Sequence, residues 1–159
     1  MKKIISSFLR TLDKIKRPKE VHAHCDIPCG IYTPNAAQVA AQTVEKMVQK
    51  LLELKAPDVH ENQQAMLAYH NSATRMVMTK EEHAQICKEE LLILWTDYFK
   101  PEHLKIFPDL HDTFWKAAKL CSKNKQEVNL EAAGQLRKAV DDIATMFAKA
   151  EKEKAKHSH

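Results

Sequence analysis

Residues 61–99 read ENQQAMLAYHNSATRMVMTKEEHAQICKEELLILWTDYF and contain neither proline nor glycine. Apolar residues recur in this stretch every three or four positions, which is the spacing of one face of an α-helix. This apolar stripe consists of Met66, Ala73, Met76, Val77, Ile86, Ile93, Leu94 and Tyr98. The stretch predicts one long helix, or two helices, because Thr79 followed by Glu82 can form a capping box that starts a second segment.

Three more helices are predicted on either side of this stretch. One follows Thr33 and Pro34, which suit the cap and the first position of a helix. Another follows a connector between Pro101 and Pro108, and the last is capped by Asn129. Each has an apolar stripe at helical spacing. The stripes are Val39, Ala40, Val44, Met47, Val48 and Leu51; Leu110, Phe114, Ala117 and Cys121; and Leu136, Val140, Ile143 and Phe147.

The composition favours helices over a sheet. The 159 residues include 2 Gly and 6 Pro, and 44% of them are hydrophobic, which is enough to form the core of one domain. No apolar run approaches the length of a membrane-spanning helix. Four amphipathic helices with short connectors bury their stripes most simply as an all-α, antiparallel up-and-down four-helix bundle. We expect this bundle to span residues 35–150 and residues 151–159 to form a solvated tail.

The positive charge of the chain is concentrated at its N-terminus. The formal net charge is +4, but residues 1–23 hold seven Lys or Arg against two Asp or Glu. These residues therefore carry +5, and the rest of the chain carries −1. A nearly neutral domain with interspersed Lys and Glu has no basic face for a phosphate backbone, which argues against nucleic-acid binding.

Residues 1–23 form a basic, amphipathic segment with Ile4, Ile5, Phe8, Leu9, Leu12 and Ile15 on one helical face. A secretory signal needs an uninterrupted apolar stretch of about 7 to 15 residues, and polar residues interrupt this one. Periodicity alone favours a surface helix that the mature protein retains. The chemistry of the next segment favours a removable leader instead.

Residues 24–34 read HCDIPCGIYTP and differ from the helical segments around them. Pro28 and Gly30 exclude a helix, so Cys25 and Cys29 lie in a loop that can bring both thiols to one metal ion. Thiolate sulfur is a soft ligand for transition metals. A disulfide between Cys25 and Cys29 is the alternative, because the loop can bend and the two residues are close in sequence.

A chain that began at His24 would have a further ligand. Its α-amine, the Cys25 amide nitrogen and the two thiolates can form a square N₂S₂ plane, which is typical of Ni(II) or Cu(II), with the His24 imidazole approaching axially. Such electron-rich donors favour a redox role over hydrolysis. In the uncut chain the His24 nitrogen is an amide bonded to Ala23 and cannot serve. We therefore predict that residues 1–23 are a removable leader, since cleavage would create a ligand.

The other two cysteines have a simpler interpretation. Four cysteines in 159 residues are too few for a disulfide framework. Cys87 and Cys121 fall within predicted helices, where buried free cysteines act as small hydrophobic residues. This usage fits a reducing compartment, and we expect the protein to be cytoplasmic.

The segment from His24 to Tyr32, HCDIPCGIY, resembles the nickel hook of nickel superoxide dismutase, a family whose mature chain begins at that histidine. Two later blocks are also similar to the family: WTDYFKP at residues 95–101 and FPDLH at residues 107–111. The resemblance spans residues 24 to about 150. We refer to residues 24–34 as the hook.

The resemblance implies that the chain disproportionates superoxide to dioxygen and hydrogen peroxide at one nickel ion per chain, which cycles between Ni(II) and Ni(III). It implies the metal ligands His24, through its amine and imidazole, Cys25, through its amide and thiolate, and the Cys29 thiolate. It further implies a cis bond before Pro28, a dedicated processing peptidase and assembly into homohexamers. A nickel or copper storage or delivery module that uses the same hook is the alternative function.

The resemblance also implies roles for residues beside the metal. Asp26, Tyr32 and Tyr98 match residues that flank the metal in the family, where they can order water on the open face and exclude larger anions. Without the resemblance, Asp26 is interpreted as a turn residue, and Tyr32 and Tyr98 are interpreted as buried tyrosines. Lys100 matches a lysine near the site entrance that can attract anionic superoxide, although taken alone it is a cation at a helix terminus.

The chain departs from the family at two positions. Counted without gaps from the hook and back from Trp95, Ala40 and His83 fall where better-known members have Glu and Arg that support the axial imidazole. The loss of both suggests that a charged pair has been replaced as a unit. The histidines within the bundle sequence, His60, His70, His103 and His111, show no convergent pairing.

Overall fold

The computed structural model describes residues 30–58 and 63–157. The leader and residues 24–29 of the hook lie outside the described residues. Within the described ranges the chain is helical and has no strand. Its elements are α2 (Asn35–Glu53), α3 (Gln63–Ile93), a π-helical turn η1 (Leu94–Tyr98), a 3₁₀ turn η2 (Pro101–Lys105), α4 (Leu110–Gln126) and α5 (Leu130–His157).

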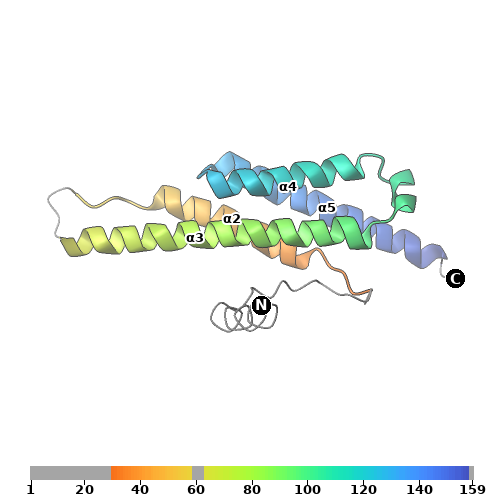
Figure 1. Ribbon diagram of the computed structural model, residues 1–159, viewed down its shortest axis with the longest axis horizontal. Helices are drawn as coiled ribbons and strands as arrows, with labels where there is room; N and C mark the ends of the chain where they lie inside the picture. The colour runs from red at the N-terminus through yellow and green to blue at the C-terminus, as the bar shows by residue number, and fades with distance from the viewer. Residues whose placement is uncertain (1–29, 59–62, 158–159) are drawn as a thin grey trace, which may run out of the picture.

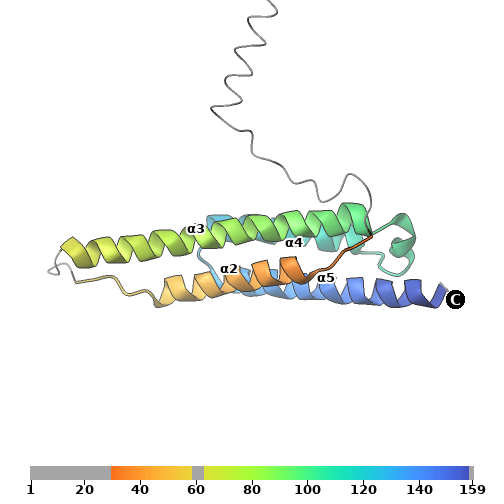
Figure 2. The same cartoon turned by 90° about the horizontal axis from the view of Figure 1, so that it is seen from below.

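The four long helices run alternately up and down (Figure 1). Helix α2 packs against α3 and α5, and α4 packs against the same two helices, so the four form a closed ring around one core. Figure 2 shows α3 with α4 in one layer and α2 with α5 in the other. The prediction of an all-α four-helix bundle is confirmed. Among the described residues, no helix is both long and apolar enough to cross a membrane.

Helix α3 continues through Thr79 without interruption over its 31 residues. The possible second start at Thr79 is therefore not used. The segment contains no helix-breaking residue, and the next residue, Lys80, is 1% exposed and must keep its helical position to reach its partners in α4.

The predicted cap at Asn129 is confirmed, whereas the predicted cap at Thr33 is displaced by one residue. Asn129 Oδ1 accepts a hydrogen bond from the Ala132 amide at 3.0 Å, as expected for the cap of α5. Thr33 Oγ1 accepts one from the Asn35 amide at 3.2 Å. Pro34, however, occupies the cap position of α2 instead of its first helical position. The hydrogen bond from the Gln38 amide to the Pro34 carbonyl, 3.0 Å long, fixes this register.

The buried residues of α4 match the predicted stripe, but the predictions for α2 and α3 are partly wrong. Of the eight residues in the predicted stripe of residues 61–99, only Leu94 and Tyr98 are buried, and the buried face of α3 is Lys80, Ala84, Cys87 and Leu91. Val39 is 59% exposed, because the buried face of α2 is Ala37, Ala40, Ala41, Val44 and Val48. Met66 is 37% exposed, and the buried residues of α3 all lie from Lys80 onward. Figure 1 shows the reason, since the N-terminal part of α3 extends beyond the end of α4.

A buried lysine closes the C-terminal end of α4. Lys80 Nζ donates hydrogen bonds to the carbonyl oxygens of Asn124, Lys125 and Glu127, the last two at 3.1 Å. Burial lowers the pKa of Lys80, but the ammonium form supplies the three N–H groups that three carbonyls require. The positive charge also lies at the negative end of the helix dipole. Lys80 thereby ties the middle of α3 to the turn between α4 and α5.

Helix α5 extends further than the sequence predicted. The chain remains helical to His157, beyond the expected limit of the bundle at residue 150. Glu151 is partly buried and accepts a hydrogen bond from Tyr98 of η1. The last turns of α5 therefore contribute to the structure at one end of the bundle.

Replacement of Lys80 by methionine is expected to lower the free energy of unfolding by about 1–3 kcal/mol, because buried carbonyl acceptors lose their donors. The control is Lys88→Met on the same helix, where the partly buried Nζ bonds only to Ser122 Oγ at 3.2 Å. Urea unfolding followed by far-ultraviolet circular dichroism measures both. Equal effects of the two substitutions would contradict the role assigned to Lys80.

Candidate metal centre

Four segments meet at one end of the bundle: residues 30–34, η1, η2 and the last turns of α5. We call this the hook end. Figure 2 shows residues 30–34 leaving α2 towards the C-terminal end of α3. The ring of Tyr32 lies 5.7 Å, centroid to centroid, from the ring of Tyr98 in η1. The segment that immediately follows the two hook cysteines is thus packed against the bundle.

Gly30 directly follows Cys29 and adopts the left-handed backbone conformation, with φ +72°. Residues with a side chain pay about 1–2 kcal/mol for this conformation, whereas glycine adopts it freely. A Cβ atom at Gly30 would meet no atom within 4 Å, so only the backbone conformation demands glycine here. The glycine allows the chain to turn between the hook cysteines and Tyr32.

Tyr98 is the central side chain of the hook end. It is 9% exposed and packs against Phe147 of α5, with the ring centroids 4.4 Å apart. Its hydroxyl donates a hydrogen bond to Glu151 Oε1 at 2.7 Å. Burial of the hydroxyl, its hydrogen bond to Glu151 and the charge of that carboxylate all raise the pKa of Tyr98. The phenol is therefore protonated at neutral pH.

The π-helical turn η1 positions Tyr98. Its five residues form a wider turn than an α-helix, closed by a hydrogen bond of 3.0 Å from the Phe99 amide to the Leu94 carbonyl. Leu94 and Tyr98 are both buried as a result. Single π-helical turns occur frequently at functional sites, because they reorient side chains at the end of a regular helix.

His103 of η2 lies on another side of Tyr98. The two rings are stacked, with centroids 5.8 Å apart and planes inclined by 15°. His103 Nδ1 accepts a hydrogen bond from the Lys100 amide at 2.9 Å, and the His103 amide donates to the Lys100 carbonyl at the same distance. The neutral ring therefore carries its proton on Nε2. This pair of bonds fixes the backbone of Lys100 beside Tyr98.

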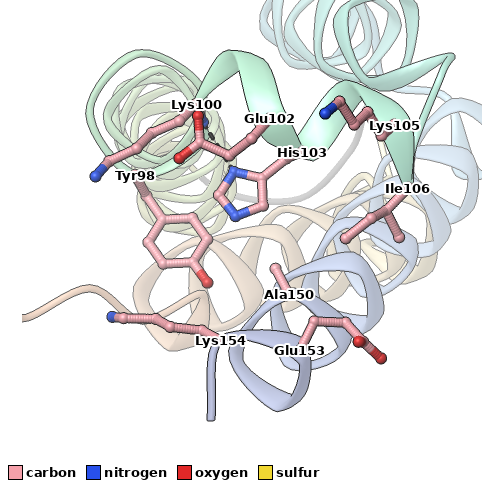
Figure 3. Close-up of a pocket in the computed structure, with 9 residues that line it drawn as sticks. All are labelled: Tyr98, Lys100, Glu102, His103, Lys105, Ile106, Ala150, Glu153 and Lys154. Carbon is pink, nitrogen blue, oxygen red and sulfur yellow. Dashed lines mark hydrogen bonds between the residues drawn. The ribbon is translucent and has the colours of Figure 1, made fainter. Parts of the chain in front are cut away.

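A cavity of about 520 Å³ opens at the hook end between η2 and α5. Tyr98, His103 and Ala150 form part of its wall, and Lys100, Lys105, Lys154, Glu102 and Glu153 provide its charged groups. In Figure 3 the Tyr98 ring lies between Lys100 and Lys154. The cavity thus joins a buried phenol to a rim that carries three lysines and two glutamates.

The two later sequence blocks contact each other. Trp95 Nε1 donates a hydrogen bond to His111 Nδ1 at 2.8 Å, which links residues 95–101 to residues 107–111. The Trp95 ring also stacks on Phe114 of α4, with centroids 5.9 Å apart. This contact joins the end of α3 to the start of α4.

The structure brings together three of the residues predicted to lie beside the metal, namely Tyr32, Tyr98 and Lys100. Lys100 is exposed at the rim of the cavity. The other predicted site residues, His24, Cys25, Asp26 and Cys29, lie outside the described residues, as does the predicted cis bond before Pro28.

Ala40 and His83 do not form a polar pair in place of the family's charged residues. Ala40 is buried in the core. His83 Nδ1 bonds to the carbonyl of Thr79, one turn earlier in its own helix, at 2.9 Å.

The remaining cysteines are unsuitable as metal ligands. Cys87 and Cys121 are free, and both are 0% exposed in the core. The pKa of Cys87 is raised, mainly by a hydrogen bond with the Cys121 thiol and secondly by burial. Among the described residues, no three His, Cys, Asp or Glu side chains are grouped to hold a metal. The other two cysteines of the chain, Cys25 and Cys29, lie outside the described residues.

Sequence reasoning missed two residues of the hook end. Glu151 was assigned to the tail, although it follows Phe147 by four residues and so lies on the same face of the helix. His103 was not paired with any partner, although it lies two residues after Pro101, where the short turn η2 folds back on Lys100. The spacing in α5 was a usable signal for Glu151, whereas the stacking of His103 on Tyr98 was not visible in the sequence.

Known proteins of one kind match this chain. Residues 19–151 match the family model of nickel-containing superoxide dismutase. The chain is 36% identical over 134 residues to a superoxide dismutase (Ni) from Streptomyces seoulensis, covering 84% of this chain and 90% of that protein. The enzyme of the same name from Streptomyces coelicolor is 34% identical over the same length, with the same coverage.

Solved structures agree with the sequence relatives. The fold resembles the native structure of a nickel superoxide dismutase with a TM-score of 0.69 and 27% identity, over 81% of this chain and 99% of that chain. A nickel-containing superoxide dismutase in the oxidised state gives a TM-score of 0.67 and 30% identity, with the same coverage.

Thiol labelling tests this division of the cysteines. In folded, metal-free protein we expect Cys25 and Cys29 to react with a maleimide, and Cys87 and Cys121 to react only after unfolding, because buried protonated thiols are poor nucleophiles. Mass spectrometry of peptides from native and denatured samples identifies the labelled residues. Rapid labelling of Cys87 or Cys121 in the folded protein would contradict the assignment.

Proposed function

The chain belongs to the nickel-containing superoxide dismutase family and is a nickel-dependent superoxide dismutase, and we propose that His24, Cys25 and Cys29 bind its metal after residues 1–23 are removed. The reaction converts two superoxide ions and two protons to one dioxygen and one hydrogen peroxide. Bound nickel would supply the redox couple, Ni(II)/Ni(III), that this disproportionation requires. The comparisons do not favour the alternative of a metal storage or delivery module.

We infer the position of the metal from the contact between Tyr32 and Tyr98. Tyr32 lies three residues after Cys29, and its ring packs 5.7 Å from the ring of Tyr98 at the hook end. A metal held by Cys25 and Cys29 must therefore lie near this tyrosine pair, because only a few residues separate these cysteines from Tyr32. The other two cysteines are enclosed in the core, which leaves the hook as the source of thiolate ligands. Cleavage before His24 adds an amine to these thiolates and completes one set of ligands. We therefore propose one nickel ion per chain.

The tyrosines and Asp26 are proposed to shape the space beside the metal. Tyr98 is buried and protonated, since burial and Glu151 raise its pKa, and it therefore adds no negative charge that would repel superoxide. Tyr32 is half-buried and forms the adjoining wall. Together with Asp26 they order water and exclude larger anions. The protons of the reaction come from solvent or from a protonated sulfur.

Lys100 is proposed to attract the substrate. Its side chain is exposed on the rim of the cavity beside Tyr98, and its backbone is fixed by two hydrogen bonds with His103. A positive charge near the entrance of a site raises the encounter rate with an anion. Superoxide is a small anion, so this attraction acts on the substrate itself.

The organisation of the mature protein follows as a proposal. A dedicated peptidase removes residues 1–23, residues 24–34 form the hook, and the bundle begins at residue 35 and ends with α5, which extends to His157. We propose homohexamers, as the resemblance implies, and the exposed apolar residues Ile31, Val39 and Trp115 provide surface for such contacts. The free thiols of Cys87 and Cys121 support a reducing compartment, the cytoplasm.

Processing and the hook thiols are tested together. Trimmed protein that begins at His24 is expected to bind nickel and dismutate superoxide, whereas the full-length chain and the trimmed Cys25→Ser and Cys29→Ser variants are expected to lose both properties. Nickel content and superoxide decay after pulse radiolysis are the measurements. Cys121→Ala serves as the control, because it removes a thiol that is enclosed in the core. High activity of the uncut chain would contradict the ligand set.

Neutralisation of Lys100 tests the attraction of substrate. We expect Lys100→Gln to lower kcat/KM about two- to fivefold at low salt and to weaken its dependence on ionic strength. Lys138→Gln is the matched control, since Lys138 is exposed and pairs with Asp142 one turn away on α5. If both variants respond to salt as the unmodified enzyme does, Lys100 has no steering role.

A further inference from the structure

The last helix holds Tyr98 by a side chain that is distant in sequence. The Tyr98 hydroxyl donates to Glu151 Oε1 at 2.7 Å, across a separation of 53 residues. Lys154 Nζ lies 3.6 Å from the same oxygen. The carboxylate of Glu151 therefore accepts a hydrogen bond from the phenol of η1 and lies beside the positive charge of Lys154 on α5. A hydrogen bond to an ionised acceptor is stronger than one between neutral groups.

Ring contacts alone do not determine where the phenol proton points. Tyr32, His103 and Phe147 contact the Tyr98 ring at centroid distances of 5.7, 5.8 and 4.4 Å. These contacts restrict the plane of the ring. The direction of the O–H bond is set by its acceptor, which is Glu151.

We propose that Glu151 is a positioning residue for superoxide dismutation, which holds Tyr98 against Tyr32 and directs the phenol proton towards α5. The inference rests on the proposed placement of the metal beside these two tyrosines. Because the proton is committed to Glu151, the oxygen of Tyr98 presents its remaining lone pair as a hydrogen-bond acceptor. Tyr98 thus orders a water molecule by accepting its hydrogen bond, and it does not donate a proton in the reaction.

The groups that face this pair are consistent with a fixed phenol. His103, on η2, is engaged at Nδ1 with the Lys100 amide, so that ring nitrogen is not an acceptor for Tyr98. Lys100 and Lys154 lie on the cavity wall with Tyr98, as Figure 3 shows, and a lysine ammonium can only donate. Glu102 and Glu153 also line this cavity, but Glu151 is the carboxylate whose oxygen lies 2.7 Å from the Tyr98 hydroxyl and accepts its hydrogen bond.

Titration of tyrosine in trimmed, nickel-free protein tests the contact independently of the metal. The chain has 3 Tyr, and comparison with Tyr98→Phe isolates the absorbance change of Tyr98. In the unmodified protein Tyr98 is expected to ionise well above the ordinary tyrosine pKa of about 10. In Glu151→Gln, which keeps the shape of the side chain but removes its charge, the pKa of Tyr98 is expected to move towards that ordinary value. An unchanged titration would overturn the proposal.

A double-substitution cycle on the nickel-loaded enzyme tests the role in the reaction. Glu151→Gln is expected to lower kcat about tenfold with little change in KM, as substitutions of groups that orient a metal site do. In the Tyr98→Phe background the same substitution is expected to have no further effect, because Glu151 acts through the phenol. An equal loss in both backgrounds would show that Glu151 acts otherwise and would overturn the proposal.

Matched controls separate this role from a structural one. Asp142→Asn removes a carboxylate from an exposed position of the same helix and is expected to leave both the titration and kcat unchanged. Urea unfolding shows whether Glu151→Gln remains folded, and Glu151→Asp, which retains the charge, is expected to restore a high tyrosine pKa. Nickel content, measured separately, reports on the ligand set. Failure of the ligands therefore appears as lost nickel, whereas failure of this inference appears as an unshifted Tyr98.

Discussion

The packing of Tyr98 at the hook end is the interaction on which the proposed site depends. Its ring contacts Tyr32, which follows the hook, and Phe147 of α5, while its hydroxyl is bonded to Glu151. One side chain therefore joins the entry to α2, the end of α3 and the last turns of α5. This contact places Tyr32, three residues after Cys29, against the bundle, and Gly30 permits the chain to turn just before it.

Burial divides the thiols of the chain into two chemical classes. Cys87 and Cys121 contribute to the core as small apolar groups, and their mutual hydrogen bond and burial keep Cys87 protonated. A thiol must lose its proton to bind a metal or to attack peroxide, so these two are protected from both reactions. This protection suits an enzyme that produces hydrogen peroxide.

The hook end combines a neutral interior with a charged rim. The surroundings of Tyr98 raise the pKa of its phenol, and Lys100, Lys105 and Lys154 provide positive charge at the cavity. Two hydrogen-bonded contacts hold the rest of the scaffold together. Lys80 bonds to carbonyl groups at the end of α4, and Trp95, after the end of α3, bonds to His111 of α4. These ties hold η1 and η2, and hence Tyr98 and His103, in a fixed relation to α5.

The sequence by itself determined the helices, the four-helix bundle and the family, because helical periodicity, caps such as Asn129 and the spacing of Cys25 and Cys29 are local properties of the chain. It also predicted that Tyr32, Tyr98 and Lys100 belong to one site, through resemblance to the family. It failed where the outcome depends on which helix lies opposite: Val39 is exposed, Lys80 is buried, and Glu151 belongs to the hook end instead of a tail. Only the tertiary structure decided these, because burial and hydrogen bonding across 53 residues depend on how the helices pack; the spacing of Glu151 from Phe147 indicates a shared helical face but not the partner of that face.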